Sequence, residues 1–118
     1  MRSLGKQGLR RARIRFGLCG LVQIHHVIPL EHAMHPVVQH LGFDIDSAQN
    51  LILMPTREGA ETLRLRPGRL IHDGGHMHYN TWVETLLSEN VSNHHEFHEV
   101  LSYLHSELRR SDARIPWR

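Results

Sequence analysis

The sequence has little of what stabilises very small proteins or anchors a chain in a membrane. It contains one cysteine, Cys19, and only two tryptophans, two tyrosines and three phenylalanines among 118 residues. A single cysteine forms no disulfide within the chain, so a hydrophobic core must hold the fold together. No stretch approaches the roughly 20 apolar residues that span a bilayer. The arginine-rich start lacks an apolar segment with a small-residue cleavage site, so we expect no signal peptide.

Acidic residues are missing from the first 30 residues, which carry six basic ones. Four arginines against eleven acids give residues 31–107 a net charge of −7, and residues 108–118 carry +3. Lysine is nearly absent too, because 13 of the 14 basic residues are arginine, which binds phosphate through two parallel hydrogen bonds. We interpret residues 1–20 as a phosphate-contacting arm, with a solvated surface as the alternative for each arginine. Its candidate contact residues are Arg10, Arg11, Arg13 and Arg15.

Histidine is the residue that the sequence has in excess, with 12 copies in 118 residues. Imidazole titrates near neutral pH and is the commonest metal ligand in proteins. The excess therefore favours a metal or acid–base site, although a small basic protein can also carry many solvated imidazoles. The spacing of the histidines separates these two interpretations.

The hydrophobic pattern predicts an α+β fold with two short strands among several helices. Apolar runs that end at proline predict strands at residues 21–29 and 51–55. The predicted helices begin at Pro36, near His76 and at an Asn93 cap.

The length predicts one domain, divided into three parts. These are a basic arm at residues 1–20, a core at 21–90 and a C-terminal helix at 91–118. Within the core, the polar and arginine-rich residues 56–69 predict a loop.

Two groups of histidines fit solvated positions better than a site. His94 and His98 share one face of the last predicted helix but lie off its apolar stripe, so we expect them to face solvent. Four others are scattered and are expected to be solvated or satisfied by hydrogen bonds: His32, His35, His40 and His78.

Two pairs of histidines do fit a site. His72 and His76 bracket Gly74 and Gly75, which let the backbone turn tightly around a shared point. Two imidazoles from this turn and one from the adjacent pair His25–His26 would give a metal three ligands and an open position, as in catalytic metal sites. The remaining imidazole of the pair could accept a proton, because an unperturbed pKa of about 6.5 suits a general base.

The adjacent pair carries a structural condition. Successive side chains of a regular strand point to opposite faces of the sheet. If His25 and His26 serve one cleft, we expect the backbone to twist or bulge near residues 24–26.

Three segments in order resemble the HNH nucleases, whose core is also called the ββα-metal fold. They are Ile24–Pro29 with its two histidines, Gln49–Pro55 with Asn50, and His72–Asn80 with its H-x-x-x-H pair. The match is closest to the AHH family, a branch of the HNH and endonuclease VII superfamily found in polymorphic toxins, and it covers residues 21–90. Two positions depart from the family's pattern. Ile24 replaces the usual alanine, and Leu51 replaces a glycine, a change expected to act on the turn before the second strand.

The resemblance implies an HNH-type core, made of a short β-hairpin and a metal-site helix with flanking helices. His25 would be the first metal ligand, and His26 would be the general base that activates water. Asn50 would hold the strand loop by hydrogen bonds and so orient His26. His72 and His76 would complete the site for one divalent ion, and three neutral imidazoles favour Zn²⁺ or Ni²⁺ over the alternatives, Mg²⁺ and Mn²⁺. The aromatic residues expected to pack behind these ligands are Tyr79 and Trp82.

These features together predict a metal-dependent endonuclease that cleaves DNA, or RNA, with little sequence preference, since no segment resembles a base-reading element. Two alternatives stay open. One is a catalytically inactive HNH-fold module that binds nucleic acid or a protein partner, and the other is a histidine-rich metal-binding protein. A nuclease endangers its own cell, so we also expect either a delivered effector controlled by an acidic immunity protein or a cytoplasmic protein kept inactive. No membrane partner is expected.

Overall fold

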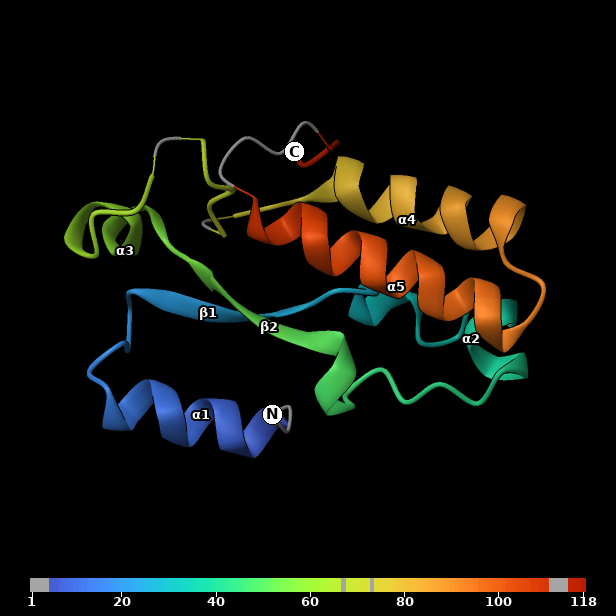
Figure 1. Ribbon diagram of the computed structural model, residues 1–118, viewed down its shortest axis with the longest axis horizontal. Coiled ribbons are helices and arrows are strands. Elements are labelled where there is room, and N and C mark those ends of the chain that lie inside the picture. The colour runs from blue at the N-terminus through green and yellow to red at the C-terminus, as the bar shows by residue number, and fades with distance from the viewer. Residues whose placement is uncertain (1–4, 67, 73, 111–114) are drawn as a thin grey trace.

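A two-stranded antiparallel hairpin lies at the centre of the computed structural model (Figure 1), which describes residues 5–66, 68–72, 74–110 and 115–118. Strand β1 (Val22–His26) pairs with β2 (Leu51–Pro55) without a break, from Val22 opposite Pro55 to His26 opposite Leu51. Proline ends β2 as the sequence predicts. The other strand is shorter than predicted. Its pairing with β2 ends at His26, three residues before Pro29.

Five α-helices surround the hairpin in the described part of the chain. They are α1 (Lys6–Arg15), α2 (Pro36–His40), α3 (Arg57–Thr62), α4 (Met77–Asn90) and α5 (His94–Arg109), with 3₁₀ turns at Leu30–His32 and Ala48–Asn50. Helix α1 lies on one side of the hairpin, and α4 and α5 pack together on the other (Figure 1). Within the described ranges, no helix is long and apolar enough to cross a membrane.

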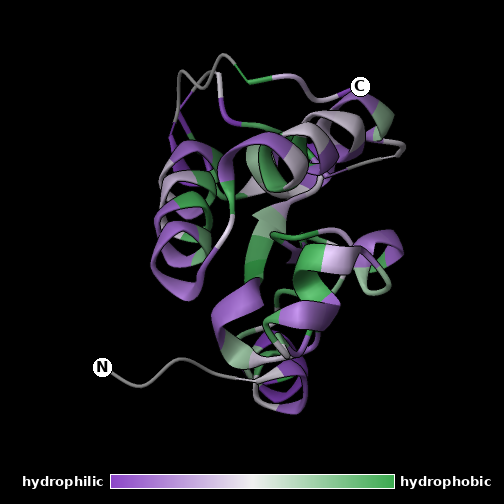
Figure 2. Cartoon of the chain, turned by 90° about the vertical axis from the view of Figure 1, so that its right-hand side faces the viewer, coloured by the Kyte–Doolittle hydropathy of each residue, from purple (hydrophilic) through white to green (hydrophobic). Residues whose placement is uncertain are grey.

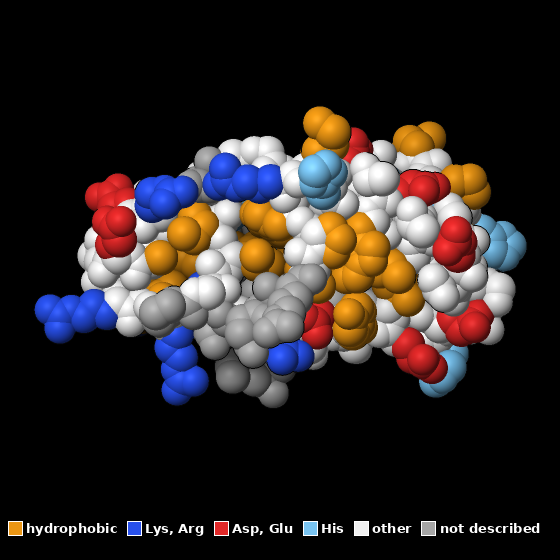
Figure 3. Space-filling view, turned by 90° about the horizontal axis from the view of Figure 1, so that it is seen from above, with side chains coloured by type: hydrophobic (Ala, Val, Ile, Leu, Met, Phe, Trp, Pro, Cys, Tyr) orange, Lys and Arg blue, Asp and Glu red, His pale blue; other side chains and the backbone are white. Residues whose placement is uncertain are grey.

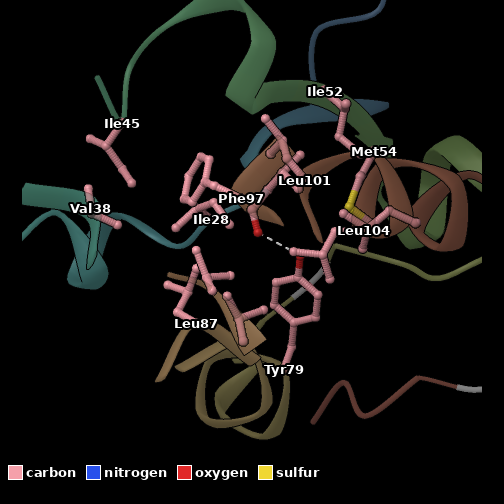
Figure 4. Packing of buried hydrophobic residues seen from close by; sticks show 14 residues of the cluster. Ile28, Val38, Ile45, Ile52, Met54, Tyr79, Leu87, Phe97, Leu101 and Leu104 are labelled. Carbon is pink, nitrogen blue, oxygen red and sulfur yellow. Dashed lines mark hydrogen bonds between the residues drawn. The ribbon is translucent and has the colours of Figure 1, made fainter. Parts of the chain in front are cut away.

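The hydrophobic core fills the space between the hairpin and the α4–α5 pair (Figure 4). Helix α4 contributes Tyr79, Val83 and Leu87 at helical spacing. Helix α5 contributes a matching stripe, Phe97, Leu101, Leu104 and Leu108. Figure 2 shows the polar residues of these helices turned outward, away from the apolar interior. The predicted fold class is confirmed: an antiparallel hairpin and several helices form a mixed α and β structure consistent with an HNH-type core.

The loop predicted at residues 56–69 is wrong for its first half, which forms α3. The hydroxyl of Thr56 caps this helix by accepting a hydrogen bond from the Gly59 amide at 3.0 Å. A Cβ at Gly59 would lie 1.7 Å from the Leu21 carbonyl oxygen, so only glycine lets α3 approach the start of β1 this closely. The helix therefore depends on a contact across the fold that the local sequence does not reveal.

Candidate metal centre

Three histidines from separate segments meet between the hairpin and α4. His25 lies on β1, His72 follows the α3 region, and His76 is the N-cap residue of α4. One ligand atom from each lies within 4.8 Å of the other two, and the ring centroids are 5.0 to 5.2 Å apart. Among the described residues, this is the single group of histidine, cysteine and acidic side chains with the arrangement of a metal site. The structure thus places together the three residues that the sequence nominates as ligands.

Hydrogen bonds to two amide side chains fix the orientation of two of these rings. The Nδ1 of His72 donates to Oε1 of Gln23 at 2.7 Å, and the Nδ1 of His76 donates to Oδ1 of Asn80 at 2.8 Å. An amide oxygen only accepts, so each ring carries a proton on Nδ1, and in the neutral form of either ring the lone pair is on Nε2. This is the usual way in which a protein orients a metal-binding imidazole.

His25 is the most buried of the three, with 2% of its surface exposed. Burial, followed by the proximity of His72, His76 and His26, lowers the pKa of His25 to about 2. Its ring is therefore neutral, as a metal ligand must be. Its Nε2 is buried and has no hydrogen-bond partner in the described part of the chain. A buried nitrogen without a partner is costly, and a metal ion bound by the three rings would satisfy it. The residues present therefore fit a divalent cation with imidazole ligands.

Two aromatic residues form a wall around the cluster. The Trp117 ring lies 5.4 Å from that of His25 and 5.1 Å from that of His76, and its Nε1 donates to the Ile71 carbonyl at 3.1 Å. Tyr79 packs 5.4 Å from His25, and its buried hydroxyl donates to the Val27 carbonyl at 2.6 Å. Burial raises the pKa of Tyr79. Sequence reasoning missed Trp117, because nothing local connects residue 117 with ligands at residues 25, 72 and 76.

Trp82, the second aromatic residue expected behind the ligands, lies one step further out. Its ring centroid lies 6.2 Å from that of Tyr79 and 6.2 Å from that of Tyr103. It therefore supports the aromatic wall through Tyr79.

His26 lies on the opposite face of the hairpin from the three ligands. A shared cleft for His25 and His26 would require a twist or bulge near residues 24–26, and the unbroken β1–β2 register excludes the bulge. The Nε2 of His26 donates to Oδ1 of Asp46 at 2.7 Å, and the Lys6 ammonium of α1 lies 4.0 Å from the same carboxylate. The hydrogen bond from His26 is the main reason why the pKa of Asp46 is lowered. Asp46 is a second residue that sequence reasoning missed.

Asn50 is completely buried and joins two segments of backbone. Its Oδ1 accepts from the Ile28 amide at 2.7 Å, and its Nδ2 donates to the carbonyls of Ile28 and Ile45 at 3.0 and 2.8 Å. Its own carbonyl accepts from the Val27 amide at 2.8 Å. These bonds hold the chain that leaves β1 at His26 against the chain that enters β2.

Leu51 does not distort the turn before β2. It is buried, and its φ of −120° and ψ of 135° are ordinary extended values that need no glycine. The departure from the family's pattern at this position therefore leaves the hairpin intact.

The arginines of the predicted arm lie on α1, on the same side of the hairpin as Asp46. Arg10, Arg11 and Arg15 are exposed, whereas Arg13 is half-buried, with a buried Nε that has no partner among the described residues. Within the predicted arm at residues 1–20, the chain forms a helix over Lys6–Arg15.

The remaining histidines are exposed or bonded to backbone and side chains elsewhere. Five are exposed: His40, His78, His94, His95 and His98. His94 and His98 are the two that were predicted to face solvent on the last helix. Three others are half-buried, and each has its Nε2 within hydrogen-bond distance of an oxygen. His32 faces an oxygen of Asn80, His35 one of Ser88, and His105 one of Gln49.

The hairpin, the following helix and the three convergent imidazoles define the class of the protein as one with an HNH-type core and a candidate metal site. Residues 20–110 match the model of the AHH family, described as a nuclease family of the HNH and endonuclease VII superfamily with a conserved AHH motif. The chain belongs to this family of nucleases. Comparisons with curated proteins and with solved structures found no match.

Proposed function

We propose that the protein is a metal-dependent endonuclease that hydrolyses phosphodiester bonds of DNA, with RNA as the alternative substrate. The observation that carries the proposal is the convergence of His25, His72 and His76, next to a histidine paired with a carboxylate. A bound divalent cation, Zn²⁺ or Ni²⁺ by ligand type, would polarise the scissile phosphate and neutralise charge on the leaving oxygen.

His26 is the proposed general base. Its Nε2 donates to Asp46, so a neutral ring has its lone pair on Nδ1, which can accept a proton from an attacking water. The imidazolium formed in this step is stabilised by the Asp46 carboxylate, which also fixes the ring orientation.

The opposite orientation of His25 and His26 limits where the substrate can lie. His26 forms the last pair of the hairpin, opposite Leu51, and beyond this pair the sheet no longer separates its two faces. A phosphodiester that reaches both the ligand cluster and His26 must therefore lie across this end of the hairpin. Asn50 would act here by fixing the backbone on both sides of the hairpin end.

The direct test is plasmid nicking with a panel of Zn²⁺, Ni²⁺, Mg²⁺ and Mn²⁺. We expect His26→Ala to slow nicking by about 10²- to 10⁴-fold, the usual contribution of a general base, while the bound metal measured by mass spectrometry is unchanged. His40→Ala is the matched control, because His40 is exposed on α2 and is not a member of the histidine cluster. Unchanged nicking by His26→Ala would remove this residue from the mechanism.

The same assay separates the proposal from its alternatives. Cleavage of RNA but not of plasmid DNA would change the substrate and keep the chemistry. Binding of metal and nucleic acid without cleavage of either by the wild type, under any of the four ions, would instead identify an inactive binding module.

A further inference from the structure

A second group of arginines lies outside α1, around two adjoining hollows. The larger hollow has a volume of about 360 Å³ and is lined by Arg57 and Arg64 with Arg66 and Arg69, and Glu61 is the one carboxylate among the described residues of its lining. A smaller hollow of about 220 Å³ shares Arg66 and Arg69 and adds Arg109, from the end of α5. Figure 3 shows basic side chains gathered toward the α3 end of this face, whereas most of the acidic side chains in view lie toward the other end. We call the lining of both hollows the arginine surface.

Arg64 occupies a backbone position that is unfavourable for arginine. Its φ is +53°, and it is the single described residue other than glycine with a positive φ. It lies just after α3, where the Leu65 amide donates to the Ala60 carbonyl at 3.0 Å, the type of helix end at which glycine is preferred. In the described part of the chain, the Arg64 side chain makes no ion pair or hydrogen bond that would offset this cost. Non-glycine residues in this backbone conformation cluster at active sites and ligand-binding sites.

Arg69 is held in place beside it. Its guanidinium donates to the Arg109 carbonyl at 2.9 Å, which links the arginine-rich segment to the end of α5. The side chain is half-buried, so this arginine is oriented by the fold rather than extended into solvent.

The arginine surface adjoins the metal centre along the chain. Ile71 lines the larger hollow, and the next residue is the ligand His72. Three residue steps separate Arg69 from His72, so their Cα atoms lie at most about 11 Å apart. A polyanion lying on the surface would thus pass within a few nucleotide steps of the three imidazoles.

We propose that the arginine surface binds the sugar-phosphate backbone of the substrate beside the bond that is cleaved. It is a binding site separate from α1, and its placement next to His72 favours a nucleic acid over an acidic protein as the occupant. The link to cleavage rests on the proposed nuclease function, whereas the binding itself does not.

The experiment measures binding without cleavage. A fluorescein-labelled DNA duplex, and an RNA duplex of the same sequence, are titrated by anisotropy in EDTA between 50 and 300 mM NaCl. Each lost phosphate contact reduces the slope of log K against log salt by about 0.9, so the double variant Arg64→Ala, Arg66→Ala should reduce it by about 2. Arg64→Lys with Arg66→Lys keeps both charges and should keep the slope, which makes it the matched control. The preferred substrate is the duplex for which the slope of log K against log salt falls more in the double alanine variant.

A single substitution separates binding from folding. Arg64→Gly relieves the positive φ, so we expect its melting temperature to rise by about 2–4 °C while its affinity for the duplex falls. A purely structural role for Arg64 would not move stability and binding in opposite directions.

The outcomes distinguish this proposal from the proposed function. An unchanged slope in the double alanine variant overturns the arginine surface, even if the wild type nicks plasmid. Polyglutamate that binds as tightly as the duplex, and loses as much affinity in the variant, overturns nucleic acid in favour of an acidic protein. A reduced slope in the double alanine variant, together with a wild-type protein that cleaves neither DNA nor RNA, supports the arginine surface and overturns the nuclease.

Discussion

Replacement of Asn50 by alanine tests how strongly the hairpin end is held. The side chain makes three hydrogen bonds to backbone groups of Ile28 and Ile45, and it is fully buried. Asn50→Ala leaves one buried amide and two buried carbonyls without this partner, and each unsatisfied group costs about 1–3 kcal/mol. The three losses share one side chain and do not add fully, so we expect about 3 kcal/mol. That is a large part of the 5–15 kcal/mol that stabilises a typical domain.

Urea unfolding followed by circular dichroism measures this loss. With a slope of about 1–3 kcal/mol per molar urea, a loss of 3 kcal/mol lowers the unfolding midpoint by about 1–3 M. Asn90→Ala is the control, because Asn90 is exposed at the end of α4 and its loss should cost less than about 0.5 kcal/mol. If Asn50→Ala unfolds within 0.5 kcal/mol of Asn90→Ala, on the scale of ordinary surface substitutions, the reasoning from unsatisfied buried groups is refuted.

Three further predictions follow from the site. Gln23→Ala and Asn80→Ala should each weaken metal affinity by about 10- to 100-fold in a competition titration with a chelating dye, since each loses the amide that orients a ligand; equal affinity would contradict this role. Asp46→Ala should lower kcat in the nicking assay with metal content unchanged, whereas Asp46→Asn, whose oxygen can still accept from His26, should retain more activity; equal rates in the two variants would exclude a role for the hydrogen bond, and rates equal to that of the wild type would exclude the charge as well. In metal-free protein the pKa of His25 is lowered to about 2 in the folded state, whereas the unfolded chain takes up this proton below about pH 6.5. The free energy of unfolding should therefore fall as the pH decreases from 6.5, by about 1.4 kcal/mol per pH unit. Urea midpoints in EDTA that stay constant between pH 7 and pH 5 would show that His25 is not buried as a neutral ring.

The ligands could be predicted from the sequence because their signals are local. His72 and His76 are separated by a glycine-containing turn, and the adjacent pair of histidines ends a strand, so spacing alone nominates them. The predicted core stripes of α4 and α5 follow the same logic, since helical periodicity is a property of short windows.

The missed features all depend on contacts between distant segments. Trp117 reaches the cluster through the fold, and Asp46 meets His26 across 20 residues. Helix α3 was missed because residues 56–69 are polar and rich in arginine, and the close approach of Gly59 to Leu21 exists only in the assembled structure. Polar pairs across a fold leave no periodic pattern in the sequence, so only the assembled structure reveals them.

The unbroken hairpin explains why an adjacent histidine pair can serve two chemical roles. The burial and neighbouring imidazoles that keep His25 neutral also make it a poor proton acceptor, because its pKa is lowered to about 2. A general base placed inside the same cluster would suffer the same effect. Alternation along β1 instead sends the next side chain, His26, to the other face, where it donates a hydrogen bond to the Asp46 carboxylate. A bulge that brought both histidines into one cleft would have lost this separation, so the regular strand favours the proposed division of roles between metal ligand and base.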